Sequence, residues 1–294
     1  MTIDARGCRD LERALSLEWL EPNGRGGYAS GTVAGANTRR YHALLLVARH
    51  PPVDRVALVN HVEESIEIGG DTCPLSTNVY GGAVHPEGYQ YCERFSDVPW
   101  PTWRFACRGI RLERELVCPH GRDLVILRWR LLDDASPAVV LRVRPMLTGR
   151  DFHATHQENA ALRSEATITG GQVLWQPYEG LPPVRAQHNG QYHHRPDWYR
   201  RIHYPVYREL VLEHVVETHA HLEIEEGGEF RLPHEVIEQL VGDAQQLGGR
   251  AGDAVRVEVL TPVVAQVARE LIGDVIIHGN RSPRVRRGAA ATGG

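Results

Sequence analysis

The chain has 294 residues, of which 42% are hydrophobic and 24% are charged, and its formal net charge is −4. This length suits one large all-β domain or two modest ones, and the apolar share is sufficient for a globular core. The small net charge gives no electrostatic case for nucleic acid or an anionic membrane, and no apolar run approaches the roughly 20 residues that a membrane span requires.

The N-terminal segment has mixed charge and lacks the apolar stretch of a secretory signal. Five cysteines are present, an odd number, and none of them forms a C-x-x-C pair. The default expectation is therefore a protein with reduced cysteines in the cytoplasm.

In chain order, residues 8–16 predict a short amphipathic helix that leads into a strand at 17–20. Hairpin turns are indicated at Gly69-Gly70-Asp71 and at Arg108-Gly109. The segments 124–132 and 138–147 alternate apolar residues with arginine, which is the period of a half-buried strand. Other strands are predicted at 40–48, 55–60, 62–68, 72–75, 103–107 and 110–117.

Short strands continue after residue 166, and helical patterns appear only at 234–247 and 263–272. The tail from His278 is basic and rich in small residues, which predicts disorder. Many short strands with regular turn signals predict an all-β fold, a large antiparallel two-sheet β-sandwich with short helices near the C-terminus. We assign residues 1–260 to this domain and 261–294 to a short helix and a disordered tail.

The stretch 21–47 holds the first candidate site. A glycine-dense turn at 23–28 begins with Asn23, and the cluster Arg39, Arg40, Tyr41 and His42 precedes an apolar strand. Many hydrogen-bond donors beside a hydrophobic wall suit a hydroxyl-rich ligand such as a sugar. The alternative is a solvated strand end beside ordinary turns. Gly24–Ala29 also fits G-x-G-x-x-A, but strands follow it rather than a helix, so we reject a dinucleotide site.

A second candidate cluster lies in the turn-rich middle of the chain. It consists of Asn78, Tyr80, Tyr89, Trp100 and Trp103. Asn78 and Tyr80 stand before a glycine pair, and aromatic residues in loops are more often exposed than those in strands. The two tryptophans, Trp100 and Trp103, have an equally good alternative interpretation as residues that fill the core. Arg150 and Asp151 are either ligand-binding residues or a structural loop pair.

Catalytic and metal chemistry find little support in the residues. The 16 histidines include no H-E-x-x-H, and no histidine or cysteine spacing matches a zinc pattern, so no metal or cofactor is predicted. Hydrolysis of a glycosidic bond needs two carboxylates that flank the scissile oxygen. Adjacent acids on a strand point to opposite faces, so Glu63 and Glu64 cannot both face one substrate. We assign no catalytic residue.

Several phrases together resemble the N-terminal domain of bacterial and archaeal glycogen debranching enzymes, the amylo-α-1,6-glucosidase family. The resemblance is specific over residues 17–153 and weaker to 232. It rests on Glu18-Trp19-Leu20, NGRGGYASGT (23–32), NTRRYHALLL (37–46), LSTNVYGG (75–82), HPEGYQY (85–91), PWPTWRF (99–105) and LTGRDFH (147–153).

The resemblance implies a supersandwich of the galactose-mutarotase type that binds α-glucan, as glycogen or maltooligosaccharide, and supports a debranching active site. It also implies that the catalytic acids lie in a C-terminal helical barrel, which nothing in this sequence resembles. Whether the chain is an enzyme stays open. The alternatives are an amylo-α-1,6-glucosidase in its own right and a remnant that needs a separate chain carrying the barrel. The expected sugar-binding residues are Asn23, Arg39, Arg40, Tyr41, His42, Asn78, Tyr80, Trp103, Arg150 and Asp151.

Overall fold

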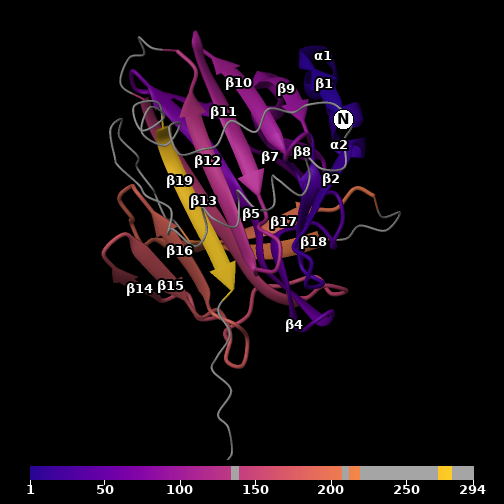
Figure 1. The fold of residues 1–294 in the computed structure, drawn as a ribbon, viewed down its shortest axis with the longest axis vertical. Helices are drawn as coiled ribbons and strands as arrows, with labels where there is room; N and C mark the ends of the chain where they lie inside the picture. The colour runs from indigo at the N-terminus through magenta and orange to yellow at the C-terminus, as the bar shows by residue number, and fades with distance from the viewer. Residues whose placement is uncertain (134–138, 207–211, 219–270, 280–294) are drawn as a thin grey trace, which may run out of the picture.

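A computed structural model describes residues 1–133, 139–206, 212–218 and 271–279, and these form two antiparallel β-sheets that enclose a shared core (Figure 1). The predicted all-β sandwich is confirmed. Two short helices, α1 (Ala5–Arg9) and α2 (Leu11–Ser16), lie beside the N-terminal strand, and a 3₁₀ turn, η1, covers Gly88–Tyr91.

The first sheet, sheet A, has nine described strands. In spatial order they are β1 (Thr2–Asp4), β9 (Cys92–Ser96), β10 (Thr102–Cys107), β11 (Ile110–Val117), β12 (Leu124–Leu131), β19 (Leu271–Gly279), β16 (Val184–His188), β15 (Gln172–Trp175) and β14 (Ala166–Thr169).

The second sheet, sheet B, has ten described strands. In spatial order they are β2 (Glu18–Pro22), β3 (Tyr28–Thr32), β4 (Ala43–His50), β5 (Val53–Ile68), β13 (Val139–Asp151), β18 (Leu212–Thr218), β17 (Pro196–His203), β7 (Thr77–Tyr80) and β8 (Ala83–Glu87), with β6 (Asp71–Pro74) paired to β5.

The core lies between the sheets because the strands alternate as the sequence predicts. In β12, Leu127 and Trp129 are buried while Arg128 and Arg130 are half-buried on the opposite face. Both predicted hairpins form, with Ile68 opposite Asp71 and Cys107 opposite Ile110. Apolar side chains of both sheets thus share one core, and their burial is the main force that holds the layers together.

The helix predicted at 8–16 forms as two helices instead of one. Asp10 has extended backbone angles and ends α1, and its carboxylate accepts a hydrogen bond from the Arg13 backbone N–H at the start of α2. Aspartate is a favoured N-cap residue, so Asp10 begins a second helix. A residue with high helix propensity at this position would have continued the first helix. The strands predicted at 55–60 and 62–68 are likewise parts of one strand, β5.

In the C-terminal part of the chain the structure describes residues 271–279. These residues form β19, which pairs with β12 on one side and β16 on the other. The β-branched run Val275-Ile276-Ile277 favours a strand. The helix predicted at 234–247 lies outside the described residues, and so does nearly all of the helix predicted at 263–272 and of the tail predicted from His278, so these stay predictions.

The expectation of reduced cysteines is also wrong for one pair. Cys73 in β6 and Cys107 in β10 form a disulfide bond that links sheet B to sheet A inside the core. Cys8, Cys92 and Cys118 are free. The location of the protein in the cytoplasm stays a prediction.

A charged pair also crosses the core. Glu64 on β5 faces inward, and its Oε1 lies 3.2 Å from Nε of Arg114 on β11. Burial raises the pKa of the Glu64 carboxyl to about 7, and the opposing effect of Arg114 is smaller. Glu63 points the other way, toward Asn78 and Arg144, which confirms that the two neighbouring acids occupy opposite faces of the strand.

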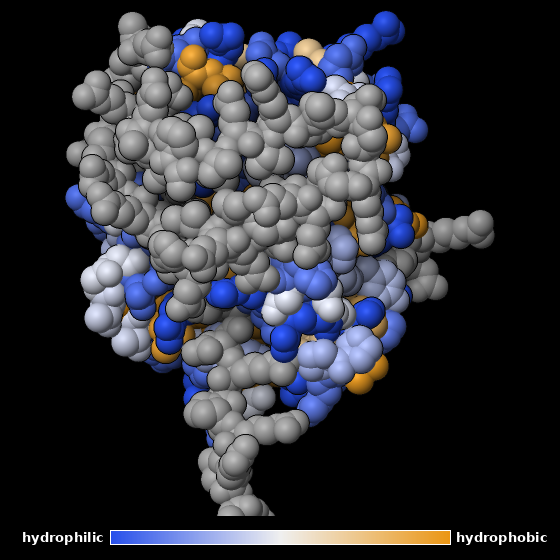
Figure 2. Space-filling view, viewed as in Figure 1, coloured by the Kyte–Doolittle hydropathy of each residue, from blue (hydrophilic) through white to orange (hydrophobic). Residues whose placement is uncertain are grey.

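The described residues that are visible in Figure 2 are mostly hydrophilic, with separate apolar spots. Among the described residues, no helix is long and apolar enough to cross a membrane. The large apolar side chains that are most exposed are scattered: Met1, Leu20, Val53, Val98, Ile168 and Val206.

Candidate functional site

The register of sheet B places one row of residues across four strands. Tyr28 pairs with Leu46, Leu46 with Ala57, and Ala57 with Arg150. Cross-strand partners share a face of the sheet, so these four side chains lie on one face. Leu46 and Ala57 are fully buried there and form a small apolar cluster separate from the main core, against which Tyr28 and Phe152 pack.

The loop before β4 brings Arg40 and Tyr41 to the segment that follows β13. Arg40 Nη1 donates a hydrogen bond to the backbone oxygen of His153 at 2.9 Å, and Tyr41 Oη lies 3.2 Å from His153 Nδ1. Tyr28 Oη donates to the Tyr41 backbone oxygen at 2.8 Å, which fixes the loop over the apolar cluster. Residues about 110 positions apart in the sequence are thereby held together.

Three rings gather at this place on the surface. The Tyr41 ring centroid is 5.7 Å from those of Phe152 and His153, and the latter two are 3.8 Å apart. The Arg40 guanidinium lies 5.7 Å from the Tyr41 centroid, and that of Arg55 lies 5.4 Å from the Phe152 centroid. Tyr41 and Phe152 are half-buried and His153 is exposed. We call this surface the Tyr41–His153 patch; it consists of Tyr28, Arg40, Tyr41, Arg55, Phe152 and His153.

Arg39 and His42 point away from the patch. Arg39 Nη2 forms an ion pair with Glu18 Oε1 at 2.6 Å, and His42 Nε2 lies 3.5 Å from the same oxygen. Burial, with the neighbouring Arg39 charge, lowers the pKa of His42 to about 3, so the ring is neutral near pH 7. Its Nδ1 accepts the Thr38 backbone N–H, and these contacts anchor the start of the loop.

Asn23 is buried in the glycine-rich turn. Its side-chain oxygen accepts the backbone N–H groups of Arg25 and Gly27, and its Nδ2 donates to Asp123. Gly26 has φ +90°, and a Cβ there would come within 2.5 Å of the Pro52 backbone oxygen. Asn23 therefore stabilises an ordinary turn, which is the alternative interpretation of this stretch.

The second predicted cluster does not meet the patch. Asn78 is 2% exposed, and its Nδ2 donates to Glu63 Oε2 at 3.0 Å. Glu63 also accepts hydrogen bonds from Arg144 and Tyr199. Tyr80 packs against a separate small core on sheet B. These residues form an internal network between strands of sheet B.

Trp103 lies in the main core. It is 1% exposed, donates from Nε1 to the Val33 backbone oxygen, and packs edge-on against Trp19. The structure therefore supports the alternative in which this ring fills the sandwich, because a ring so deeply buried offers no face to a sugar. Trp100 is half-buried and donates to Glu115.

Arg150 and Asp151 border the patch from the end of β13. Arg150 is 4% exposed and lies opposite Ala57, in the same row of sheet B as Tyr28. Asp151 is exposed, and its Oδ1 accepts the His153 backbone N–H at 2.8 Å, which shapes the turn that presents Phe152 and His153. Asp151 therefore positions the patch.

Four members of the patch were missed by sequence reasoning. Tyr28, Phe152 and His153 stand inside the phrases that carry the family resemblance, so the signal was available. Arg55 has no such signal, because only the register of β5 with β13 places it beside Phe152.

No group of three or more metal-ligating side chains occurs within the described ranges. Among the histidines between residues 188 and 203, His188 is buried and His194 is hydrogen-bonded to Tyr192. The sequence pair His219 and His221 lies outside the part of the chain that the structure describes.

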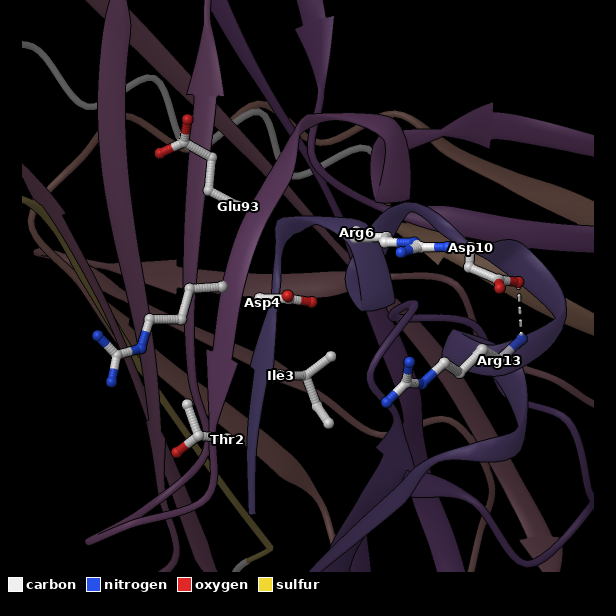
Figure 3. Close-up of a pocket in the computed structure, with 8 residues that line it drawn as sticks. Thr2, Ile3, Asp4, Arg6, Asp10, Arg13 and Glu93 are labelled. Atoms are coloured by element: carbon white, nitrogen blue, oxygen red, sulfur yellow. Dashed lines mark hydrogen bonds between the residues drawn. The ribbon is translucent and has the colours of Figure 1, made fainter.

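A cavity of about 840 Å³ lies elsewhere, at the N-terminal corner (Figure 3). Figure 3 shows the side chains of Asp10 and Arg13 at the break between α1 and α2 and that of Glu93 on the neighbouring strand. Asp4 and Asp10 act as helix caps through one oxygen each. None of the predicted sugar-binding residues lines this cavity, and its charges are of both signs. The lining residues are Thr2, Ile3, Asp4, Arg6, Asp10, Arg13, Glu93 and Arg94.

The fold and the patch define a two-sheet antiparallel β-sandwich domain with rings and guanidinium groups presented on one face of sheet B. The family model described as "Glycogen debranching enzyme N terminal" matches residues 17–222, and the chain belongs to this family. The match includes every residue of the Tyr41–His153 patch. A comparison with curated proteins finds no significant match.

Proposed function

We propose that the chain binds α-glucan, as glycogen or maltooligosaccharide, through the Tyr41–His153 patch. The observation that carries the proposal is the gathering of three surface rings between two guanidinium groups on an apolar floor. A pyranose ring has one apolar face and a rim of hydroxyl groups. The aromatic faces suit the former, and planar donors such as arginine suit the latter.

The patch is built before any ligand arrives. Arg40 and Tyr41 are held to His153, Tyr28 is held to the Tyr41 backbone, and the rings rest on Leu46 and Ala57. Binding to a rigid surface costs less conformational entropy than binding to side chains that must first be ordered. The patch is open, which suits a long polymer better than a small enclosed ligand.

Membership in the glycogen debranching enzyme N-terminal family supports the choice of α-glucan among polysaccharides. In this proposal the patch holds a glucan chain and so supports a debranching active site carried by a helical barrel, whether in the same protein or in a partner chain. We assign no bond-breaking step to the described residues.

We expect Tyr41→Ala to weaken maltooligosaccharide binding by about 1–3 kcal/mol, roughly 5- to 150-fold in Kd, because it removes a ring face and the bond to His153. Isothermal titration calorimetry on the folded variant measures this effect. Tyr89→Ala is the matched control: Tyr89 is another half-buried tyrosine, in η1, and binding should be unchanged. Wild-type affinity in Tyr41→Ala, or no heat from the wild-type protein at millimolar sugar, contradicts the proposal.

A further inference from the structure

The outer edge of sheet A is formed by β14. This strand pairs with β15 through the two-residue turn Gly170-Gly171, whose φ values are +44° and +73°. On its other side β14 has no partner among the residues that the structure describes. Figure 1 shows β14 at the periphery of the molecule, beyond β15 and β16.

The register determines which backbone groups point outward. The His188 backbone N–H donates to the oxygen of Gly171, which directly precedes β15. Backbone hydrogen bonds along an antiparallel strand alternate between its two neighbours. Val173 and Trp175 therefore bond to β16, and Gln172 and Leu174 bond to β14. Their partners in β14 are Thr169 and Thr167. The N–H and C=O groups of Ala166 and Ile168 therefore point away from β15.

The same edge leaves part of the core-facing layer uncovered. Ile168 lies opposite Val173, and cross-strand partners share a face. Val173 is fully buried in the main core, whereas Ile168 is 54% exposed. An isoleucine on the inner face with half its surface free is a position that another strand would cover.

The strands at the other three ends of the two sheets carry features that oppose pairing with another chain. β2 carries Glu18, Glu21 and Pro22, and β8 carries Pro86 and Glu87. β1 is three residues long, and helix α1 follows its Asp4 directly. Charges and proline are common protections of sheet edges. The sequence of β14, Ala-Thr-Ile-Thr, has neither, and none of the residues from 166 to 174 is charged.

We propose that β14 is a self-association edge, where a second copy of the chain adds antiparallel and continues sheet A across a two-fold axis through Thr167. Ile168 then faces Ala166 of the partner subunit, and Ala166 faces the partner's Ile168. Each of these two pairs exchanges two hydrogen bonds through the groups that point outward. A second copy fits this edge because the strand carries no charge, so two copies of it can pair without electrostatic repulsion. The pairing also buries the exposed surface of each Ile168.

The axis makes a position-specific prediction for crosslinking. Thr167 would face its own copy in a non-hydrogen-bonded pair, with Cα atoms about 4.5 Å apart, which is within disulfide range. Thr167→Cys should therefore form a disulfide-linked dimer under mild oxidation. The matched control is Thr169→Cys, whose copies would be about 13 Å apart along the strands and should stay uncrosslinked. Equal crosslinking of both variants, or none by Thr167→Cys, overturns the proposal.

Sedimentation of the wild-type chain over a concentration series provides the second test. The small interface predicts a reversible dimer whose share increases with concentration. Ile168→Lys should shift the chain to monomer, because the charge would lie on the face that the partner covers. The control is Val98→Lys, at another exposed apolar residue, in the loop between β9 and β10, and it should leave the dimer intact. A wild-type chain that stays monomeric throughout, or a dimer unchanged by Ile168→Lys, overturns the proposal.

Discussion

Replacing Arg114 with methionine is expected to lower the free energy of unfolding by about 3–5 kcal/mol once the pH is high enough to ionise Glu64, above about 7, because it leaves the Glu64 carboxylate in the core without its cation. The Glu64 side chain is 0% exposed and Arg114 is its ion-pair partner at 3.2 Å. Arg114 also lies 4.5 Å from the Trp103 ring centroid, so the variant loses that contact as well. Urea unfolding of wild type and variant measures the difference.

The effect should depend on pH. Burial holds the pKa of Glu64 above its value of 4.5 in an unfolded chain, and Arg114 lowers it, so loss of Arg114 raises it further. A carboxyl whose folded pKa is raised contributes stability that is present below the unfolded pKa and is lost as pH rises through the folded pKa. The variant should therefore be closest to wild type in acid and fall behind as pH increases.

Two companion variants separate this cause from general damage. Removal of both charges, in Arg114→Met/Glu64→Leu, should restore most of the lost stability, because apolar replacements of buried ion pairs are often neutral. Arg111→Met breaks the exposed pair with Asp133 and should have a much smaller effect, because solvent screens exposed ion pairs. If Arg114→Met costs no more than Arg111→Met, the buried pair does not have the role assigned to it.

The second large effect is expected at the disulfide that joins the sheets. Cys73→Ala/Cys107→Ala should lower the free energy of unfolding by about 3–4 kcal/mol, as the chain-entropy relation gives for a loop of this length. The two cysteines are 34 positions apart and link β6 of sheet B to β10 of sheet A. Denaturant unfolding with and without reductant measures the contribution.

Cys118→Ala provides the control for this experiment. Cys118 is a free cysteine, so the variant should retain the response of the wild type to reductant. The double variant should have lost that response. An unfolding midpoint of the wild-type chain that is the same in oxidising and reducing buffer would contradict a stabilising disulfide.

Much of the fold could be predicted from local patterns. The alternation of arginine with apolar residues in β12, and the turns at Gly69-Gly70 and Arg108-Gly109, depend on neighbours in sequence. Three features could not be predicted, because each depends on long-range pairing. These are β19 inside sheet A, the Cys73–Cys107 bond, and the crossing of the core by Glu64 and Arg114.

The candidate site was predictable in part for the same reason. The sequence indicates donors and rings near Arg40 and Tyr41, but adjacent residues in that loop diverge: Arg39 turns to Glu18, and Tyr41 turns to His153. The partners of Tyr41 lie more than 100 positions away, and only the register of β5 with β13 brings them near. Trp103 shows the opposite case, in which a residue type that suits sugar binding serves the core.

The most direct test of the proposed function is hydrogen–deuterium exchange of the whole chain with and without saturating maltooligosaccharide. The account predicts slower exchange at residues 40–41 and 152–153, which supply four of the six patch residues, with the interior of sheet A unchanged. No change at either segment, or protection confined to another surface such as the cavity beside α1 and α2, would contradict the claim that the Tyr41–His153 patch holds the glucan.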